Sequence, residues 1–121
     1  MQYMLLIYDD EQLWERMSES ERKAILDEYF QFSASIRESG NYVGSNALQP
    51  TGTATSVRVR GGETLVTDGP FAETKEQLGG YYLVEATDVD QAIQLAARIP
   101  SARFGTVEVR PVMVFTEGAT A

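Results

Sequence analysis

Two consecutive glycines between two strand-like segments are the feature that most constrains the fold of this chain. Residues 55–60 alternate between polar or charged and apolar side chains, residues 63–67 are also typical of a strand, and Gly61 and Gly62 separate the two runs. Both central positions of a tight hairpin turn can require a positive φ, which glycine adopts without steric cost. The segment therefore predicts a β-hairpin with a two-residue loop.

The register of that hairpin gives its side chains a direction. With a two-residue loop, Val57 faces Val66, and continuing the count places Asp68 opposite Thr55. Asp68 then lies on the same face as Val57, Val59 and Val66. A carboxylate at the end of an apolar strand face is suited to ligand binding or proton transfer, so Asp68 is the candidate catalytic residue.

The remaining segments predict a β-α-β unit on each side of the hairpin. Residues 2–8 are apolar on both faces, as in a central strand. Ser18-x-x-Glu21 is a capping box, apolar residues at helical spacing follow it, and Gly40 supplies a stop, which predicts a helix over residues 18–39. The other predicted elements are strands at 42–48, 80–87 and 107–115, with a second helix that starts at Asp88 and ends before Pro100.

This order of elements predicts an α+β fold. The expected architecture is a ferredoxin-like antiparallel sheet with two helices on one face plus an extra β-hairpin. We expect a single domain over residues 1–115 and a short flexible tail at 116–121. The strands carry more apolar residues than one helix-covered face needs. A second copy of the chain is the simplest cover for the other face, so we expect a homodimer.

Composition restricts the chemistry that this domain can perform. The chain has 18 acidic and 10 basic residues, a net charge of −8 that disfavours nucleic acid and anionic membrane surfaces. It contains neither His nor Cys, so the usual zinc ligands and the commonest general base are missing. Asp9 and Asp10 alone are too weak a signal for a metal, and no cofactor is expected. The apolar start lacks a basic leader, and we expect a cytoplasmic protein.

Residues 68–82 combine backbone punctuation and charge more densely than any other segment. They hold a Gly69-Pro70 turn, four acid or base side chains and a Gly79-Gly80 pair between two predicted strands. Gly79-Gly80 indicates a backbone that is either flexible, as in a lid, or closely approached by another segment. We interpret this stretch as the functional centre, and the sequence leaves open whether the Gly69–Pro70 bond is cis or trans.

The same stretch carries a family resemblance. Asp68-Gly69-Pro70-Phe71, followed by AETKEQLGG over residues 72–80, resembles the hallmark of the DGPF-type branch of the YCII-related proteins. Because the central motif is long and specific and the resemblance covers almost the whole chain, the chain is identified as a member of that branch. Four further segments resemble the family in the same order, at residues 3–6, 48–50, 55–58 and 107–112.

The resemblance implies a dimeric α+β barrel, in which two ferredoxin-like sheets pack face to face. It implies less about activity, because most of the family has no assigned reaction. Members often occur beside genes for extracytoplasmic-function sigma factors. Some wider YCII-like proteins resemble small-ring lyases or dehalogenases that use a His-Asp pair. This chain has no His, so that pair is not transferred to it.

Each residue of the 68–80 loop has a functional and a structural interpretation. Asp68 is an acid/base or ligand anchor, or else a turn residue that bonds backbone amides. Phe71 lines a pocket or pins the loop to the core, and the core role is favoured. Glu73 and Lys75 lie over a pocket or in a solvated turn, and the turn is favoured.

Strand residues supply the other candidates. Arg58 and Arg110 are suited to bind an anion or to pair with a nearby carboxylate. Tyr81 and Tyr82 point to opposite faces, so at most one of them lines the same cavity as Asp68. The candidate ligand-binding residues are therefore Arg58, Phe71, Glu73, Lys75, Tyr81 and Arg110.

Two hypotheses for function follow. In the first, a homodimer binds a small anionic or aromatic molecule near the 68–80 loop and carries out lyase- or isomerase-like acid/base chemistry. Asp68 is then the acid/base, and Arg58 or Arg110 holds the anion. In the second, the protein is a non-catalytic ligand-binding or regulatory module associated with an extracytoplasmic-function sigma factor system.

Overall fold

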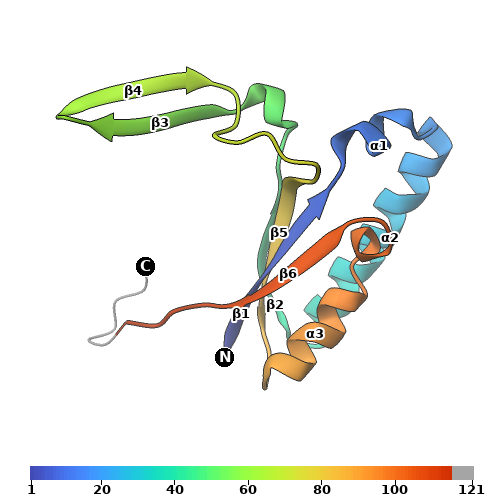
Figure 1. Cartoon of the computed structure of the whole chain (residues 1–121). Helices are drawn as coiled ribbons and strands as arrows, with labels where there is room; N and C mark the ends of the chain where they lie inside the picture. Colours follow the sequence, from blue (N-terminus) through green and yellow to red (C-terminus); the bar gives the residue numbers. More distant parts are fainter. Residues whose placement is uncertain (116–121) are drawn as a thin grey trace.

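The computed structural model describes residues 1–115, and a four-stranded antiparallel sheet lies at its centre (Figure 1). The predicted tail at 116–121 lies outside the described residues. The helices and strands are β1 (Gln2–Asp9), α1 (Glu11–Arg16), α2 (Glu19–Glu38), β2 (Tyr42–Ala47), the 3-10 turn η1 (Thr51–Thr53), β3 (Thr55–Arg60), β4 (Glu63–Asp68), β5 (Gln77–Glu85), α3 (Val89–Ala97), the 3-10 turn η2 (Pro100–Arg103) and β6 (Thr106–Pro111).

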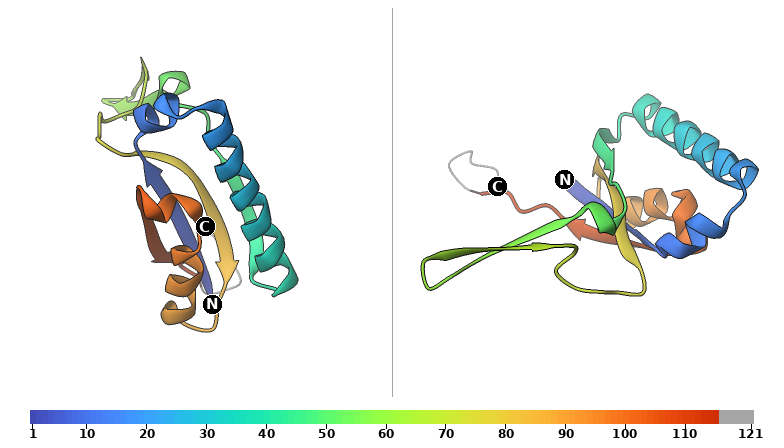
Figure 2. Two further views of the ribbon diagram at one scale, coloured as in Figure 1. Left: turned by 90° about the vertical axis from the view of Figure 1, so that its right-hand side faces the viewer. Right: turned by 90° about the horizontal axis from the view of Figure 1, so that it is seen from above.

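The sheet confirms the predicted α+β class. Its strand order is β2-β5-β1-β6, so the two strands that follow helices, β2 and β6, lie at the edges. β1 pairs antiparallel with both β5 and β6. The helices α2 and α3 lie on one side of the sheet, and the two views of Figure 2 agree on this arrangement. This is the arrangement that the β-α-β pattern on each side of the hairpin predicts.

The long helix α2 forms where its capping box predicts. The Ser18 hydroxyl accepts a bond from the Glu21 amide at 3.0 Å, and the Glu21 carboxylate accepts one from the Ser18 amide at 3.2 Å. These two bonds satisfy amides that the first helical turn leaves without partners. Just beyond the helix, Gly40 has a φ of +82°, which ends it.

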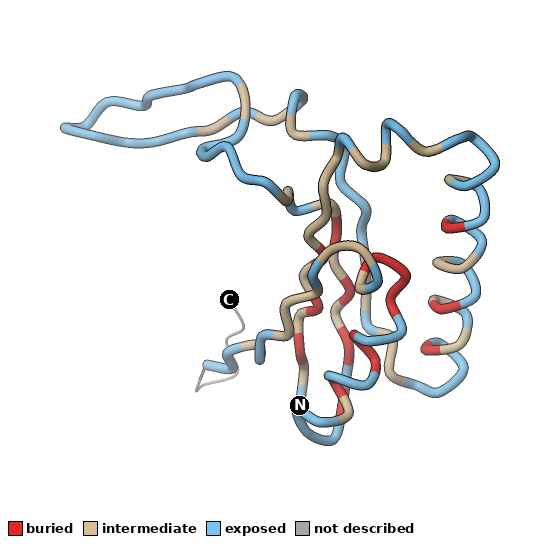
Figure 3. Tube along the Cα trace, turned by 45° about the vertical axis from the view of Figure 1, so that its right-hand side comes forward, coloured by how far each residue is buried: buried red, intermediate tan, exposed pale blue. Residues whose placement is uncertain are grey.

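The hydrophobic core lies between the sheet and these helices. Leu5 of β1, Val84 of β5 and Ile36 of α2 are fully buried, and the red segments of Figure 3 gather along this interface. Phe32 and Tyr82 pack edge-to-face with ring centroids 5.1 Å apart. The core comprises Tyr3, Leu5, Ile7, Phe32, Ile36, Tyr82, Val84, Ala86, Ala92, Leu95, Ala96 and Ile99.

The opposite face of the sheet has no such cover among residues 1–115. Leu6 of β1 pairs with Tyr81, and Met4 pairs with Leu83, so these four side chains share that face. All four are only half-buried. The predicted excess of apolar surface is therefore present on this face.

The β3–β4 hairpin has the predicted register. Val57 pairs with Val66, and Thr55 pairs with Asp68. Gly61 and Gly62 both have positive φ, at 57° and 80°, as the two-residue turn requires. The hairpin forms a separate two-stranded sheet that projects from the main sheet on the side away from the helices (Figure 1).

One helix and the limits of two strands differ clearly from the sequence prediction. The short helix α1 was not predicted. It is only six residues long and holds no buried residue, so it leaves little periodicity to detect. β5 begins at Gln77 rather than at residue 80, and β6 ends at Pro111 rather than at residue 115. Past Pro111 one further bond joins the chain to β1, from the Val112 amide to the Gln2 carbonyl at 3.0 Å. Because Gln2 is the first residue of β1, residues 113–115 extend beyond the end of that partner strand. No helix within residues 1–115 is long and apolar enough to cross a membrane.

Candidate functional site

A shallow groove of about 460 Å³ lies where the start of α1, the turn η1 and the loop before β5 meet. One wall comes from residues 70–77, which are part of the stretch interpreted as the functional centre. The groove is lined by Asp10, Glu11, Gln12, Thr51, Gly52, Pro70, Ala72, Glu73, Thr74, Lys75 and Gln77.

Glu11, at the start of α1, links α1 to both η1 and the start of β5 at this groove. Its carboxylate accepts bonds from the Thr51 amide at 2.8 Å and from the Thr51 hydroxyl at 2.6 Å. Its own amide donates to the side chain of Gln77 at 3.0 Å. The two bonds to the Glu11 carboxylate are charge-assisted and therefore stronger than neutral ones. Together the three bonds hold η1 and the start of β5 against α1. This residue was missed because its partners are 40 and 66 residues away along the chain.

The wall formed by residues 70–77, the outer wall of the groove, is held at its ends rather than along its length. At the first end, the Gly69 amide donates to the Ala54 carbonyl, and the Ser56 hydroxyl donates to the Gly69 carbonyl, both at 2.7 Å. At the other end the Gln77 side chain donates to the Thr74 carbonyl. Gly69 has a φ of +98°, which favours glycine there, and the bond to Pro70 is trans.

Two of the predicted ligand-binding residues line this groove, namely Glu73 and Lys75. Both are exposed on the wall formed by residues 70–77. Their placement agrees with the solvated-turn interpretation and at the same time brings two opposite charges to the groove. Phe71 of the same loop is 81% exposed and does not reach the core, which corrects the favoured interpretation of this residue.

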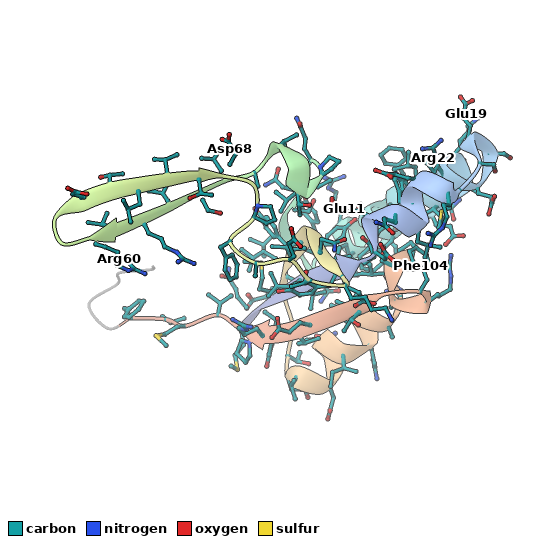
Figure 4. The ribbon with its side chains drawn as sticks, turned by 45° about the horizontal axis from the view of Figure 1, so that its top comes forward. Glu11, Glu19, Arg22, Arg60, Asp68 and Phe104 are labelled. Carbon is teal, nitrogen blue, oxygen red and sulfur yellow. The ribbon has the colours of Figure 1, made fainter. Side chains whose placement is uncertain are left out.

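Asp68 and Arg58 lie on the hairpin and outside the groove. Asp68 ends β4 on the face of Val57, as predicted, whereas Arg58 pairs with Leu65 and points to the opposite face. The proposed acid/base and this proposed anion clamp therefore lie on opposite faces of the hairpin, and its backbone separates them. Figure 4 shows Asp68 on the hairpin, away from Glu11 at the groove.

Arg110 and Tyr81 form a third location, on the face of the sheet away from the helices. Arg110 pairs with the Glu108 carboxylate at 2.6 Å, in agreement with the expected pairing to a nearby carboxylate. The Tyr81 hydroxyl accepts a bond from the Asn46 side chain at 2.8 Å. Tyr82 points the other way and bonds Ser33 at 2.7 Å, so the two tyrosines do occupy opposite faces.

A partly buried set of hydrogen-bonded side chains at the end of β1 was not predicted from the sequence. The Ser101 hydroxyl donates to the Asp9 carboxylate at 3.0 Å and lies 2.5 Å from the Tyr29 hydroxyl. Burial raises the pKa of the Asp9 carboxyl, and the bond from Ser101 opposes that rise in part. The neighbouring charges of Glu76, Glu11 and Asp10 raise the pKa further. Burial also raises the pKa of Tyr29. The only sequence signal for these hydrogen-bonded side chains was an acid, Asp9, directly after an apolar strand.

Gly79 and Gly80 lie within β5, so they are not the hinge of a lid. A Cβ on Gly80 would come within 2.8 Å of the Asn46 carbonyl oxygen in β2. At Gly79 a Cβ would meet the Asp9 carboxylate at 3.5 Å. Close backbone approach, the other interpretation of this pair, accounts for Gly80.

A second groove, of about 490 Å³, lies between α2 and α3. Its charged groups already have partners, since Arg103 pairs with Glu28 at 2.6 Å and Arg98 donates to Ser35 at 2.6 Å. Arg98 also lies 5.3 Å from the centre of the Phe32 ring. These contacts tie the two helices together, and we assign this groove a structural role. Within the described residues, no three acidic side chains gather closely enough to hold a metal ion.

Comparison with known proteins extends the family resemblance seen in the sequence. Residues 1–116 match the family described as the YCII-related domain. A relative in Rhizobium meliloti (strain 1021) is 36% identical over 120 residues, covering 98% of this chain and 97% of that protein. That relative is itself described as an uncharacterized protein.

Proposed function

This chain belongs to the YCII-related family, and from that premise we propose that it is a homodimer that binds a small polar molecule in the groove beside the 68–80 loop. We further propose that it is a member of the DGPF-type branch, because Asp68-Gly69-Pro70-Phe71 stands at the head of that loop. The observation that carries the proposal is the position of this motif loop, which forms one wall of a polar groove.

The groove residues favour a ligand with an anionic group. Lys75 supplies a cation on the wall formed by residues 70–77, and Glu73 on the same wall and Asp10 on another supply carboxylates. A small carboxylate or phosphate would pair with Lys75, while a hydroxyl or amino group on the same molecule would donate to an acid. Small hydroxy or amino acids, including aromatic ones, fit this pattern of charges.

Exposed apolar surface supports the dimer. One face of the sheet presents Met4, Leu6, Tyr81 and Leu83 without a covering layer in the described chain. A contiguous apolar face of this kind marks an interaction site in soluble proteins. Two such faces packed against each other would bury both, and a two-fold axis needs only one surface that complements itself.

Acid/base chemistry is a second candidate function, and the state of Asp9 favours it. Its half-buried carboxyl has a raised pKa, which moves it toward the range where a general acid works near neutral pH. Asp10, the next residue along the chain, lines the groove. Asp68 is a second candidate acid/base, at the end of the hairpin. A binding or regulatory role in a sigma-factor system needs the groove and the dimer but neither acid.

A thermal-shift screen tests the binding proposal. The panel would hold aromatic acids, lactones and small hydroxy or amino acids, because a ligand present at about 100 times its Kd stabilises a protein by about 2.7 kcal/mol. We expect at least one acid to raise the Tm of the wild type and to lose most of that effect with Lys75→Ala. The chain has only one other lysine, the exposed Lys23 of α2, so Lys23→Ala is a matched control that should keep the full shift. A flat response across the panel would contradict the proposal.

The dimer is tested separately by light scattering. We expect the mass of two chains at micromolar concentration, and Leu83→Asp should give the mass of one. Leu83 is half-buried on the uncovered face, where a second copy would have to desolvate the new carboxylate. A wild-type protein that is monomeric under these conditions would rule the homodimer out.

A further inference from the structure

The β3–β4 hairpin is the least covered ordered element of the molecule. Val57, Val59 and Val66 share one of its faces and are 61%, 60% and 62% exposed. Leu65, on the other face, is 44% exposed. In Figure 3 the hairpin is almost entirely pale blue from base to tip. Three valines on one exposed strand face are an apolar surface that no described part of the same chain covers.

A hairpin in this state needs a partner to be stable. An isolated two-stranded hairpin is only marginally stable in water, and a third strand or another layer is usually required. The hairpin nevertheless has complete pairing from Thr55–Asp68 to Arg60–Glu63. The sequence thus encodes a regular hairpin whose apolar face lacks the layer that would stabilise it.

The position and length of the hairpin fit a second copy of this chain as that layer. It projects on the same side as the uncovered face of the sheet, and the view from above in Figure 2 shows the same direction. The six residues of β3 span roughly 20 Å at about 3.3 Å per residue, whereas two packed sheets lie only about 10 Å apart. A hairpin of that length would pass the plane of contact and extend along the second copy.

Area favours the same occupant, and charge does not oppose it. The exposed apolar side chains of the hairpin and of residues 113–115, on this side of the sheet, offer on the order of several hundred Å², a large part of the roughly 800 Å² that each partner gives to a standard interface. The hairpin carries Arg58, Arg60, Glu63 and Asp68, so it is neutral in total on a chain with a net charge of −8. A neutral arm adds no charge repulsion to the contact between two acidic copies. The side chains that make up this area are Val57, Val59, Val66, Met113, Val114 and Phe115.

We propose that the β3–β4 hairpin is a clasp that packs its Val57, Val59 and Val66 face against a second copy of the chain and holds the outer wall of the groove in place. This inference rests on the homodimer of the proposed function and adds which element completes the site. The coupling to the groove runs through the base of the hairpin. Gly69 directly precedes the groove wall, and it forms hydrogen bonds with Ala54 and Ser56 at the start of the hairpin. The site is then complete only when the hairpin is docked.

Two neighbouring residues of β4 provide the test. Val66 and Thr67 are both exposed and point to opposite faces of the hairpin. Val66→Asp places a carboxylate on the docking face, and Thr67→Asp places the same charge on the other face as a matched control. We expect Val66→Asp to raise the dissociation constant of the dimer at least tenfold in sedimentation equilibrium, with less than a threefold change for Thr67→Asp. Because both positions are exposed in the single chain, folding should survive either change, and circular dichroism would verify it.

Amide hydrogen exchange, measured on the wild type, Val66→Asp and Thr67→Asp, reports how firmly the groove wall is held. In the wild-type dimer we expect slow exchange in the hairpin and in residues 70–76, and faster exchange in both segments for Val66→Asp alone. Trypsin gives an independent reading, because Arg58 and Arg60 lie in β3 and should be cut faster in that variant.

The outcomes separate this inference from the proposed homodimer. A monomeric wild type overturns both. A dimer that Leu83→Asp dissociates and Val66→Asp leaves intact overturns the clasp alone, and so does equal weakening by Val66→Asp and Thr67→Asp. A dimer that Val66→Asp weakens while residues 70–76 keep wild-type exchange overturns the link between the hairpin and the groove.

Discussion

The two faces of the main sheet are built from alternate residues of the same strands and meet different surroundings. On one face Leu5 and Val84 are fully buried under α2 and α3. On the other face Leu6 and Leu83 are half-buried, and the hairpin on that side exposes three valines. The described chain therefore covers one face by itself, and in the proposed homodimer a second copy would cover the other.

This difference separates the contacts that stabilise the single chain from the surfaces on which the proposed dimer depends. The buried face contains the contacts that specify the fold, and its polar groups have partners, as Tyr82 does in Ser33. The motif loop and the hairpin lie on the side that is left uncovered. The function proposed here therefore depends on surfaces that contribute little to the stability of the single chain.

The first prediction compares neighbouring leucines on the two faces. We expect Leu5→Ala to cost about 2–5 kcal/mol of unfolding free energy, because it leaves a cavity in a fully buried site, and to leave the dimer intact. We expect Leu6→Ala to cost less and to weaken the dimer. Urea unfolding and light scattering measure the two effects. Equal losses of stability without an effect on the dimer would show that both faces are covered alike within one chain.

The second prediction compares two glycines of the sheet. Gly80→Ala should cost about 1–3 kcal/mol, because its Cβ would lie 2.8 Å from the Asn46 carbonyl oxygen and force a backbone shift. Gly44, in the edge strand β2, has nothing within 4 Å of the position of a Cβ, so Gly44→Ala is the control and should change stability by less than about 0.5 kcal/mol. Thermal unfolding measures both. If the two variants lose equal stability, close approach is not the reason for Gly80.

The third prediction concerns the groove itself. Glu11→Gln should lower the Tm by about 4 °C, corresponding to roughly 1 kcal/mol, because the amide replaces one acceptor of the two Thr51 bonds by a donor. Glu15→Gln, on the exposed side of the same helix, provides the comparison and should leave the Tm within about 1 °C. Calorimetry that showed no difference between the two variants would remove Glu11 as the link across the groove.

The fourth prediction is the pH dependence set by Asp9. Its pKa in the folded protein is raised above the ordinary value of 3.8, so the folded state binds this proton more tightly than the unfolded state does. Stability should therefore fall as pH rises from about 4 through the raised pKa, and the loss should be complete above it.

Asp9→Asn removes this titration and should flatten that part of the stability profile, measured by urea unfolding at a series of pH values. The exposed Asp27 of α2 is the control, and Asp27→Asn should keep the wild-type slope. An unchanged slope in Asp9→Asn would assign the dependence to another group.

Local sequence patterns predicted much of the fold. The capping box and Gly40 predicted the long helix over residues 18–39, and α2 runs from Glu19 to Glu38. Gly61 and Gly62 predicted the hairpin register, because positive φ at both positions permits one loop length. The helix α1 was missed because it is held by the long-range contacts of Glu11 rather than by its own periodicity.

The candidate site was predicted only in part. The motif loop was identified, and two of its charged residues, Glu73 and Lys75, do line the groove. The predicted register already placed Arg58 and Asp68 on opposite faces of the hairpin, but the sequence could not show that both would lie outside that groove. It also gave no sign that Thr51, from another turn, would complete it.

By itself the sequence determined most of the elements, their order, the hairpin register and the family, because capping, turn chemistry and side-chain periodicity act between residues close together in the chain. Tertiary structure alone decided which polar residues meet. Glu11 reaches Thr51 and Gln77, and Asp9 reaches Ser101 across 92 positions, because β1 lies in the middle of the sheet and delivers its last residues to the junction of several loops. The physical reason is that contacts between distant segments depend on how whole elements pack, and no local pattern encodes that packing.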